Sequence, residues 1–554
     1  MIGLNKIGLN QVQLNRLRLN APFPAYGKMA GGGGSGDGFP VLPGDVTRWH
    51  FGGLTNEMMA AMDDPRIEDA DGKGRFLSFK NFAWGGMSGV GGYGDENHLT
   101  FYKFTFDDYV FIAIKAGVKH MNFTFRVTGL QPGNKLTLAF FGTTNTVYGT
   151  WDKDGIYTVN SAVVEVGKPV YFYNGYGSTR GEFTIEILPL YPGFILGDGV
   201  DDFAVTEKEL NFEDTYTVYT AFIPFQNNPA RNMILCGADS KKTFSMQYSS
   251  LVYVSFIAGN NYYINADFVN GLNLFACKRN GNNICIKNLL TNKVVTGTCG
   301  DWVENAGLYY LWKNATYASF ARAGIAGQII DNGHFTTDEE DENILNWHKK
   351  QYPWLFPDQA WTVTGKTNED EDRATIANIT GNGNDLILSN FGFAEGSGYN
   401  EEGEYAGYLV TDGVDDMIGS SIFEIGKDFT IIAEWKFMDN IIANAGISKA
   451  LSLFVYNTNK GLRIFINNTT KGPVLNTKTL KAICSDGRVY SDDWSEMIVN
   501  EEQPITSSKS SLLIGINGNN FAKIALKNLA IYNQILSKDD CIKAYNYLQT
   551  LKAK

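Results

Sequence analysis

Apolar and polar residues alternate along much of the chain, and the alternation is clearest between residues 93 and 192. Apolar side chains are concentrated in segments such as Val110–Ile114, Met121–Val127, Lys135–Phe141 and Glu182–Leu188. A period of two places one set of side chains on one face, which is typical of half-buried strands. Gly, Pro, Asn and Asp turns separate these segments. The pattern predicts roughly seven short strands and a small β-sandwich.

Other parts of the chain repeat each other. Residues 66–84 match residues 375–393 at a constant offset of 309, and Gly197–Asp202 matches Thr411–Asp416 at an offset of 214. A strand-like segment follows both Gly197–Asp202 and Thr411–Asp416. A repeat of this length predicts two copies of one domain.

The two copies also end alike. Residues 319–352 and 520–551 each predict a strand, a turn and an amphipathic helix, with Thr337 or Ser537 as the N-cap before acidic residues. The spacing inside the copies differs, because 114 residues separate Trp84 from Asp198 but only 19 separate Phe393 from Asp412. The first copy therefore carries an inserted domain of about 95 residues, the sandwich predicted above.

The N-terminus has a different pattern. Residues 2–20 repeat Ile-Gly-Leu-Asn-like units with a period of five, and a glycine-rich run follows at 31–38. So short a period cannot bury its own apolar side chains, so these residues need neighbouring copies or a docking surface. We predict an anchor followed by a flexible joint, with a frayed terminus as the alternative.

These boundaries divide the chain into five parts. They are an N-terminal anchor or oligomerisation segment (1–30), a glycine-rich hinge (31–44), a first sandwich (45–92 and 193–356), an inserted β-sandwich (93–192) and a second sandwich (357–554).

Composition excludes several classes of protein. Charged residues make up 19% of the 554 residues, and 60 glycines with 13% aromatics favour strands and turns over helices. The net charge is −12; residues 1–36 carry +4, which leaves −16 for the other 518. An acidic body argues against nucleic-acid binding. We expect no membrane span and no secretion signal, and the six cysteines lack C-x-x-C spacing, which predicts free buried thiols.

The strings Asp198-GVDD and Asp412-GVDD, and the ending Leu529-AIYNQILSKDDCIKAYNYL, resemble laminin-G-like domains of the concanavalin-type jelly-roll superfamily. The whole arrangement resembles virion fibre and adhesin proteins of crAss-like tailed phages that infect gut Bacteroidales. The residues that carry this second resemblance are the IGLN/VQLN start, the glycine joint, GNGND-LILSNF, Phe82-AWGGMSG and Tyr191-PG.

The resemblance implies an all-β chain with two concanavalin-like (laminin-G-like) sandwiches, one inserted sandwich and an extended N-terminal anchor. It also implies location in the virion after synthesis in the host bacterial cytoplasm. Residues 1–30 would dock on other virion structural proteins or form a homo-oligomer, a trimer or alternatively a dimer. The sandwiches would recognise a host surface glycan.

The sequence contains no recognised catalytic motif. Retaining β-glucan hydrolases of the superfamily carry Glu-x-Asp-x-(x)-Glu on one strand, because two carboxyl groups must flank the sugar. That pattern is absent, and we interpret the acidic runs Asp338–Glu342 and Glu369–Asp372 as solvated or helix-capping. Glu401, Glu402 and Glu404 border a glycine-rich loop that is either a surface site or a solvated turn. We predict no enzyme and no cofactor, with calcium as the one open question.

The repeated D-G-V-D-D motif is the candidate metal site, because calcium prefers carboxylate oxygens. The alternative is a turn, in which Asp side chains accept hydrogen bonds from nearby backbone amides. The candidate ligands are Asp198, Asp201 and Asp202 in the first copy and Asp412, Asp415 and Asp416 in the second.

Aromatic rings are the candidate sugar contacts, because a pyranose face packs on a ring while its hydroxyls bond to polar side chains. Four aromatics lie next to turns or in a polar stretch, namely Trp151, Tyr262, Tyr263 and Trp494.

The sequence thus predicts a virion fibre or adhesion protein that displays glycan-binding sandwiches. Two alternatives remain: a phage-borne polysaccharide depolymerase and a bacterial carbohydrate-binding surface protein.

Overall fold

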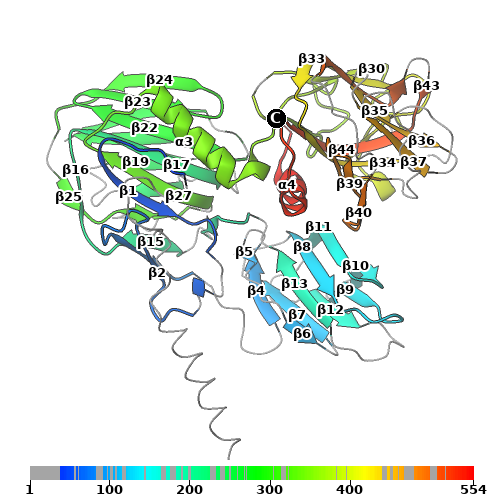
Figure 1. Cartoon of the computed structure of the whole chain (residues 1–554), viewed down its shortest axis with the longest axis horizontal. Helices are drawn as coiled ribbons and strands as arrows, with labels where there is room; N and C mark the ends of the chain where they lie inside the picture. The colour runs from blue at the N-terminus through cyan, green and yellow to red at the C-terminus, as the bar shows by residue number, and fades with distance from the viewer. Residues whose placement is uncertain are drawn as a thin grey trace, which may run out of the picture. The chain divides into compact units, whose positions relative to one another are not determined.

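The structure is a computed structural model (Figure 1). It describes residues 38–54, 58–59, 61–82, 91–95, 98–99, 104–106, 109–114, 120–141, 145–163, 170–174, 183–188, 191–197, 201–224, 232–236, 244–248, 251–258, 260–267, 269, 271–302, 305–313, 320–321, 323–381, 383–394, 396–438, 446–449, 453–458, 461–466, 479–498, 508–517 and 520–553. The predicted anchor (1–30) and the first half of the glycine-rich hinge (31–37) lie outside these residues.

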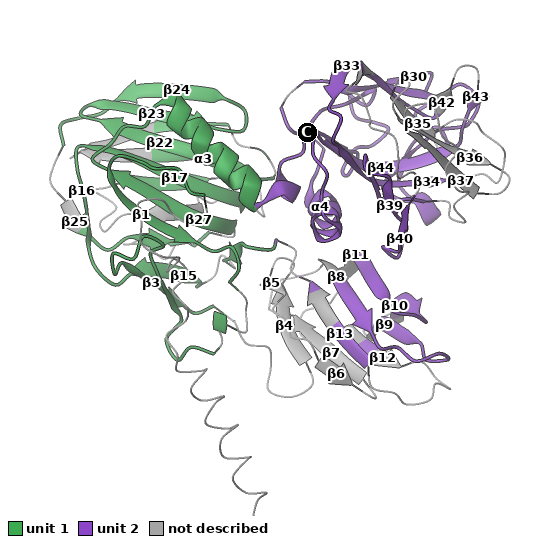
Figure 2. Ribbon diagram, in the orientation of Figure 1, with its two compact units in different colours: residues 1–89, 93–102, 192–351 green, residues 90–92, 103–191, 352–554 purple. Residues whose placement is uncertain are grey.

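The chain divides into two compact units (Figure 2). Unit 1 contains residues 1–89, 93–102 and 192–351, and unit 2 contains residues 90–92, 103–191 and 352–554.

Unit 1 is built on two large antiparallel sheets. The first has the spatial order β1 (Asp45–His50), β27 (Ala323–Asn332), β17 (Thr215–Pro224), β22 (Asn273–Asn280), β23 (Asn283–Asn288) and β24 (Lys293–Thr298), and β14 (Ile195–Leu196) pairs with β27. The second has the order β2 (Arg66–Glu68), β3 (Phe76–Lys80), β15 (Phe203–Thr206), β26 (Tyr310–Leu311), β18 (Asn232–Cys236), β19 (Phe244–Tyr248), β20 (Val252–Ala258) and β21 (Asn260–Ala266). A small pair joins β16 (Leu210–Phe212) and β25 (Asn305–Gly307).

The core of unit 1 contains side chains from both large sheets. On β17 and β22 the residues Val218, Phe275 and Cys277 are fully buried, and they belong to the same cluster as Phe79 and Val254 of the second sheet. Alternate residues of β22 therefore face the core, as the period of two predicts.

Helix α3 (Asp338–Gln351) packs on the first sheet of unit 1, where Figure 1 shows it crossing β22 and β23. The predicted N-cap is confirmed, because Thr337 Oγ accepts a hydrogen bond from the Glu340 amide at 3.2 Å and the Glu340 carboxylate accepts one from the Thr337 amide at 2.7 Å. This is the reciprocal arrangement of a capping box.

One residue of this acidic run is neither solvated nor capping, contrary to our interpretation of the sequence. Asp341 is 1% exposed and pairs with Lys278 Nζ on β22 at 2.7 Å. Tyr219 and Thr336 donate hydrogen bonds to its other oxygen at 2.8 and 3.1 Å. The sheet beneath α3 supplies the partners, so the carboxylate is buried and fully bonded.

Unit 2 contains residues 103–191 of the inserted segment, which form two antiparallel sheets. One has the order β10 (Asn145–Trp151), β9 (Leu136–Phe141), β12 (Val170–Asn174) and β7 (Tyr109–Ile114), and the other has the order β11 (Gly155–Val163), β8 (His120–Thr128), β13 (Phe183–Leu188) and β6 (Phe104–Phe106). The start of the inserted segment belongs to unit 1, where β5 (His98–Leu99) pairs with the end of β4 (Gly91–Asp95).

The remainder of unit 2 is a second large sandwich. One sheet has the order β31 (Gly398–Asn400), β32 (Tyr408–Val410), β44 (Ile524–Tyr532), β34 (Thr430–Phe437), β38 (Ala482–Cys484), β39 (Arg488–Tyr490) and β40 (Glu496–Ile498), and β28 (Gln359–Thr362) pairs with β44. The other has the order β29 (Thr375–Ile376), β30 (Leu386–Ser389), β33 (Met417–Ile425), β41 (Ser508–Ile514), β35 (Gly446–Lys449), β36 (Leu453–Thr458) and β37 (Gly461–Ile466).

Short elements complete this sandwich. They are the 3₁₀ turns η1 (Pro353–Leu355) and η2 (Gly403–Tyr405), the pair β42 (Ile516–Asn517) and β43 (Asn520–Phe521), and helix α4 (Lys538–Thr550). Ser537 caps α4 as predicted, since its Oγ accepts a hydrogen bond from the Asp540 amide at 3.1 Å.

The two copies make the same local contacts. Trp49 and Trp361 each donate an indole hydrogen bond to a backbone carbonyl at 3.0 Å, and their acceptors are Arg75 and Asn384. Strand registers also correspond, because Ile195 pairs with Ile325 in unit 1 as Leu409 pairs with Leu526 in unit 2. These registers let each residue of one copy be compared with its counterpart in the other.

The all-β fold class is confirmed, since the described residues form mainly antiparallel sheets and the two longer described helices, α3 and α4, end the two copies. No described helix has both the length and the apolar character needed to cross a membrane. Five cysteines are free thiols, and four of these are buried: Cys277, Cys299, Cys484 and Cys541.

Candidate functional site

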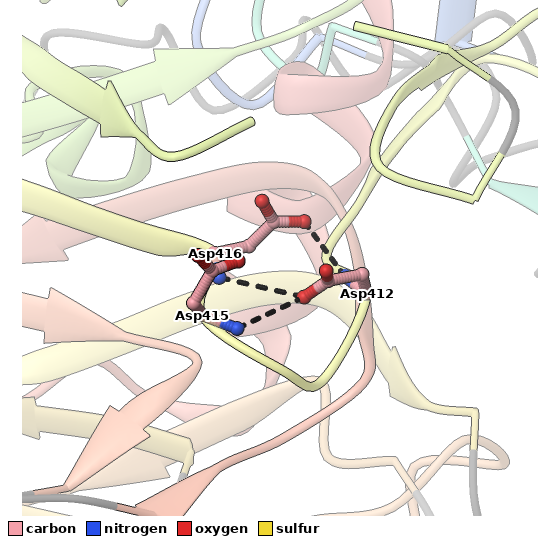
Figure 3. A group of neighbouring side chains, drawn as sticks. All are labelled: Asp412, Asp415 and Asp416. Carbon is pink, nitrogen blue, oxygen red and sulfur yellow. Dashed lines mark hydrogen bonds between the residues drawn. The ribbon is translucent and has the colours of Figure 1, made fainter. Parts of the chain in front are cut away.

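The second D-G-V-D-D motif forms a closed turn between β32 and β33 (Figure 3). Single carboxylate oxygens of Asp412, Asp415 and Asp416 lie within 4.8 Å of one another. Asp412 Oδ1 accepts hydrogen bonds from the amides of Val414, Asp415 and Asp416 at 2.7, 3.2 and 3.4 Å. Asp416 in turn accepts the Asp412 amide at 2.7 Å and the Ser397 hydroxyl at 3.1 Å.

These hydrogen bonds are the ones expected if the aspartates stabilise a turn. Calcium takes six to eight oxygen ligands, whereas here Asp412 Oδ1 and both oxygens of Asp416 already accept hydrogen bonds from protein groups. Burial raises the pKa of Asp416, and the neighbouring carboxylates of Asp412 and Asp415 raise it further, although its hydrogen bonds oppose the shift. Calcium binding stays a prediction.

The first motif is only partly described. Asp198 lies outside the described residues, Asp201 is exposed, and Asp202 is fully buried. The backbone carbonyl of Asp201 accepts a hydrogen bond from the Asn81 side chain at 3.0 Å, which again fits a structural turn.

Two of the four predicted sugar-contacting aromatics have described side chains. Trp151 on β10 is half-buried, with its ring centroid 4.9 Å from that of Phe125 and 5.2 Å from that of Tyr157. Trp494 is only 1% exposed and lies between the rings of Tyr490 and Tyr545. Its faces are covered by protein, so it is not available to a sugar.

The other two predicted aromatics lie on β21. The backbones of Tyr262 and Tyr263 pair with Phe256 and Ser255 of β20, and their side chains lie outside what the structure describes.

A different group of side chains has the chemistry of a binding site, and it was not predicted from the sequence. It lies on one sheet of the second copy, where β32, β44 and β34 are neighbours, together with η2. All its members except Asn528, which is 1% exposed, are half-buried. We call it the tyrosine–lysine cluster; its members are Tyr405, Tyr408, Glu434, Lys436, Lys527 and Asn528.

Glu434 is the centre of the cluster. Its Oε1 accepts a hydrogen bond from the Tyr408 hydroxyl at 2.6 Å, and its Oε2 accepts one from Asn528 Nδ2 at 3.1 Å. Lys527 Nζ lies 3.8 Å from Oε2. Burial and the Glu434 carboxylate raise the pKa of Tyr408, so its hydroxyl stays protonated as the donor.

The lysines lie close to the tyrosine rings. Lys436 Nζ is 5.8 Å from the ring centroid of Tyr405 and 5.9 Å from that of Tyr408, and Lys527 Nζ is 5.7 Å from that of Tyr408. These distances are within the range of cation–π attraction. The two rings meet edge to face at 6.2 Å.

Two groups of the cluster have incomplete sets of partners among the described residues. Lys436 makes no ion pair within the described part of the chain. Asn528 donates to Glu434, but its buried Oδ1 accepts no hydrogen bond from the described residues. An unsatisfied buried acceptor costs about 1–3 kcal/mol, so it needs an explanation.

A β-bulge shapes the cluster. Along β44 the partners of Glu434 and Trp435 are Asn528 and Leu526, so Lys527 is the extra residue that breaks the alternation of side chains. The first copy has the same bulge, because the partners of Ala221 and Phe222 on β27 are Gly327 and Ile325.

The first copy therefore shows what this fold requires at the cluster positions. By register, Phe194 is the counterpart of Tyr408, Ala221 of Glu434, Ile223 of Lys436, Ala326 of Lys527 and Gly327 of Asn528. None of these residues is charged, and the four with side chains beyond glycine are buried. The first copy thus forms the same bulge around uncharged residues.

A third lysine lies near the cluster. Lys481 Nζ donates to the Asp492 carbonyl at 2.5 Å and lies 4.9 Å from the ring centroid of Tyr545. Burial lowers the pKa of Lys481 to about 8, while the carboxylates of Asp492 and Glu434 oppose that shift.

Searches of protein-family models and of curated proteins find no match. Among solved structures, the binding domain of botulinum neurotoxin type C is similar at 10% identity with a TM-score of 0.27, covering 62% of this chain and 92% of the other; its title states that cell entry of that toxin depends on two ganglioside molecules. A binding domain of botulinum neurotoxin DC, solved with a ligand that its title calls SialylT, is similar at 8% identity with a TM-score of 0.25, covering 60% and 92%.

Proposed function

We propose that this protein is a non-enzymatic adhesion protein of a virion and that the tyrosine–lysine cluster binds a glycan. The observation that carries the glycan site is the contrast between the copies. A half-buried Glu434 and two lysines occupy positions where the same fold has Ala221, Ile223 and Ala326. Partial burial of a charged group costs free energy, and binding of a ligand is a role that compensates for this cost.

The cluster offers the groups that sugars use. Tyrosine rings supply apolar surface, while carboxylate, amide and ammonium groups bond to hydroxyls. Glu434 is already held by Tyr408, Asn528 and Lys527, which supports a role in binding rather than as a free catalytic acid.

The proposed location of the protein in the virion is based on the sequence. The cationic repeats of residues 1–30 and the glycine run are the basis for an anchor on other virion proteins and for a homo-oligomer, with a trimer favoured. Several chains on one particle would multiply a weak glycan affinity through avidity.

Binding of host surface polysaccharide to the full chain, measured by calorimetry, tests the site. We expect Glu434→Gln to lower affinity at least tenfold, about 1.4 kcal/mol, because the charge-assisted bonds from Tyr408 and Lys527 weaken. The matched control is Glu424→Gln, an exposed glutamate on β33 in the other sheet, which should change nothing. Equal binding by both variants would refute the site.

Two further results would decide between the alternatives. Release of reducing ends from the polysaccharide would establish a depolymerase instead. Recovery of the protein in bacterial envelopes, and not in purified particles, would establish a bacterial surface protein.

A further inference from the structure

The balance of charge in the tyrosine–lysine cluster indicates which glycans it binds. Glu434 is the one acidic member, and each of its oxygens already accepts a hydrogen bond. Lys527 lies 3.8 Å from it and so offsets its charge. The charge of Lys436 is left without an acidic partner among the described residues.

Lys436 is also partly removed from water. It is half-buried on β34, and its ammonium group lies within 6 Å of the ring centroids of both Tyr405 and Tyr408. Cation–π attraction holds it there but leaves its positive charge uncompensated. The counterpart in the first copy is Ile223, which is 2% exposed, so packing at this position is satisfied by an apolar side chain.

Long-range attraction does not explain the cation. The whole chain carries −12, so its general field repels anions. A local positive charge is effective only at short range, because screening at physiological salt acts over about 8 Å. A ligand must therefore bring its own negative group into contact with the cluster.

We propose that the tyrosine–lysine cluster selects glycans that carry an anionic group, with Lys436 contacting a carboxylate or sulfate of the sugar. This selectivity rests on the proposed glycan-binding function. The proposal adds to that function a class of ligand, anionic glycans, and the residue that recognises the anion, Lys436.

A matched pair of ligands tests the selectivity. The probes are a glucuronic-acid-containing oligosaccharide and the same oligosaccharide after its carboxyl groups have been reduced to hydroxymethyl groups; a sulfated oligosaccharide of equal length forms a third arm. We expect the full chain to bind the acidic form at least tenfold more tightly than the reduced form. Raising the salt concentration should weaken binding of the acidic form only. Binding of the sulfated form alone would assign the anion as sulfate.

Variants of Lys436 identify the residue responsible. Lys436→Met should remove the preference and leave binding of the reduced form unchanged, whereas Lys436→Arg should retain it. Lys427→Met, at an exposed lysine in the turn before β34, is the control and should retain it as well. Thermal melts of each variant verify that it folds.

The outcomes separate the two proposals. Equal binding of the acidic and reduced forms would overturn the selectivity and leave the glycan site standing. An undiminished preference in Lys436→Met would overturn the role of Lys436. Binding of none of the three probes, with host polysaccharide also unbound, would overturn both proposals.

Discussion

The side-chain amide of Asn390 donates a hydrogen bond to the backbone carbonyl of Asp415 at 3.0 Å. Asn81 makes the same bond to Asp201 in the first copy, also at 3.0 Å. Both asparagines adopt the left-handed backbone conformation, with φ of 67° and 68°. Asparagine tolerates this region better than most residues do, so each residue both turns the chain after a strand and ties it to the aspartate motif.

We therefore expect Asn390→Ala to destabilise the second sandwich by about 1–3 kcal/mol, because alanine loses the hydrogen bond and is strained at positive φ. Urea denaturation measures the change. Asn390→Gly keeps the backbone conformation and loses only the hydrogen bond, so its loss should be smaller. An equal loss in both variants would show that the conformation is not strained.

The buried carboxylate of Asp341 gives a second prediction. Asp341→Asn leaves Lys278, which is 4% exposed, with an uncompensated charge. Breaking a buried ion pair costs about 3–5 kcal/mol. Asp338→Asn is the matched control: Asp338 pairs with Lys287 at 2.5 Å but is 91% exposed, so its loss should stay below about 1 kcal/mol. Chemical denaturation of both variants gives the comparison, and similar losses would contradict the buried pair.

The stability of unit 1 should depend on pH through His348. Its side chain is buried, with Nδ1 3.0 Å from the Ile344 carbonyl, and burial lowers its pKa from 6.5 to about 4. Between pH 6.5 and 4 the unfolded chain binds the proton that the folded chain does not. Stability is therefore full above about pH 6.5 and falls as the pH drops toward 4, by about 3 kcal/mol in total.

Melting curves of unit 1 between pH 4 and 7 measure this effect. The variant His348→Leu has no titrating group at this position, so its stability should fall less steeply over the same interval. Identical slopes for the variant and the unchanged chain would assign the acid sensitivity to other groups.

The D-G-V-D-D turn can be separated from a calcium site by two substitutions. Asp412→Asn keeps a side-chain oxygen for the three amides, whereas Asp412→Ala removes it. If the motif is a structural turn, Asp412→Asn should lower the free energy of unfolding only slightly, and Asp412→Ala should lower it by about 1–3 kcal/mol. The melting temperature should then be the same in EDTA and in calcium. A melting temperature of the unchanged chain that rises with calcium, and fails to rise in Asp412→Asn, would establish the metal.

Deletion of residues 1–30 tests the anchor. The described residues begin at 38, and the contacts described for the cluster all join residues beyond the deleted segment. We expect the shortened chain to bind glycan with unchanged affinity per chain but to be lost from purified particles. Normal incorporation into particles would refute the anchor.

The sequence predicted the sheets because a period of two translates directly into one buried face, as on β22, where Phe275 and Cys277 reach the core. It predicted the helix caps because Thr337 and Ser537 act through residues three positions away. Local pattern suffices for such features.

The sequence did not predict features that depend on distant neighbours. Trp494 stands in a polar stretch, yet Tyr490 and Tyr545 cover its ring. Asp341 belongs to an acidic run that reads as solvated, but Lys278 on β22 lies beneath it. The tyrosine–lysine cluster was missed because Lys527 sits at a bulge, where alternation no longer tells which face a side chain occupies. Comparing aligned positions of the two copies for gained charges would have found it.

The bulge opposite Glu434 and Trp435 has a consequence for engineering the chain. Since β27 and β44 carry it at the same register position, with Ala326 at the extra position in one copy and Lys527 in the other, this irregular backbone accommodates either a small apolar or a long charged side chain. Side chains at this position can therefore be exchanged between the copies to alter the chemistry of one sheet while its strand pairing is kept.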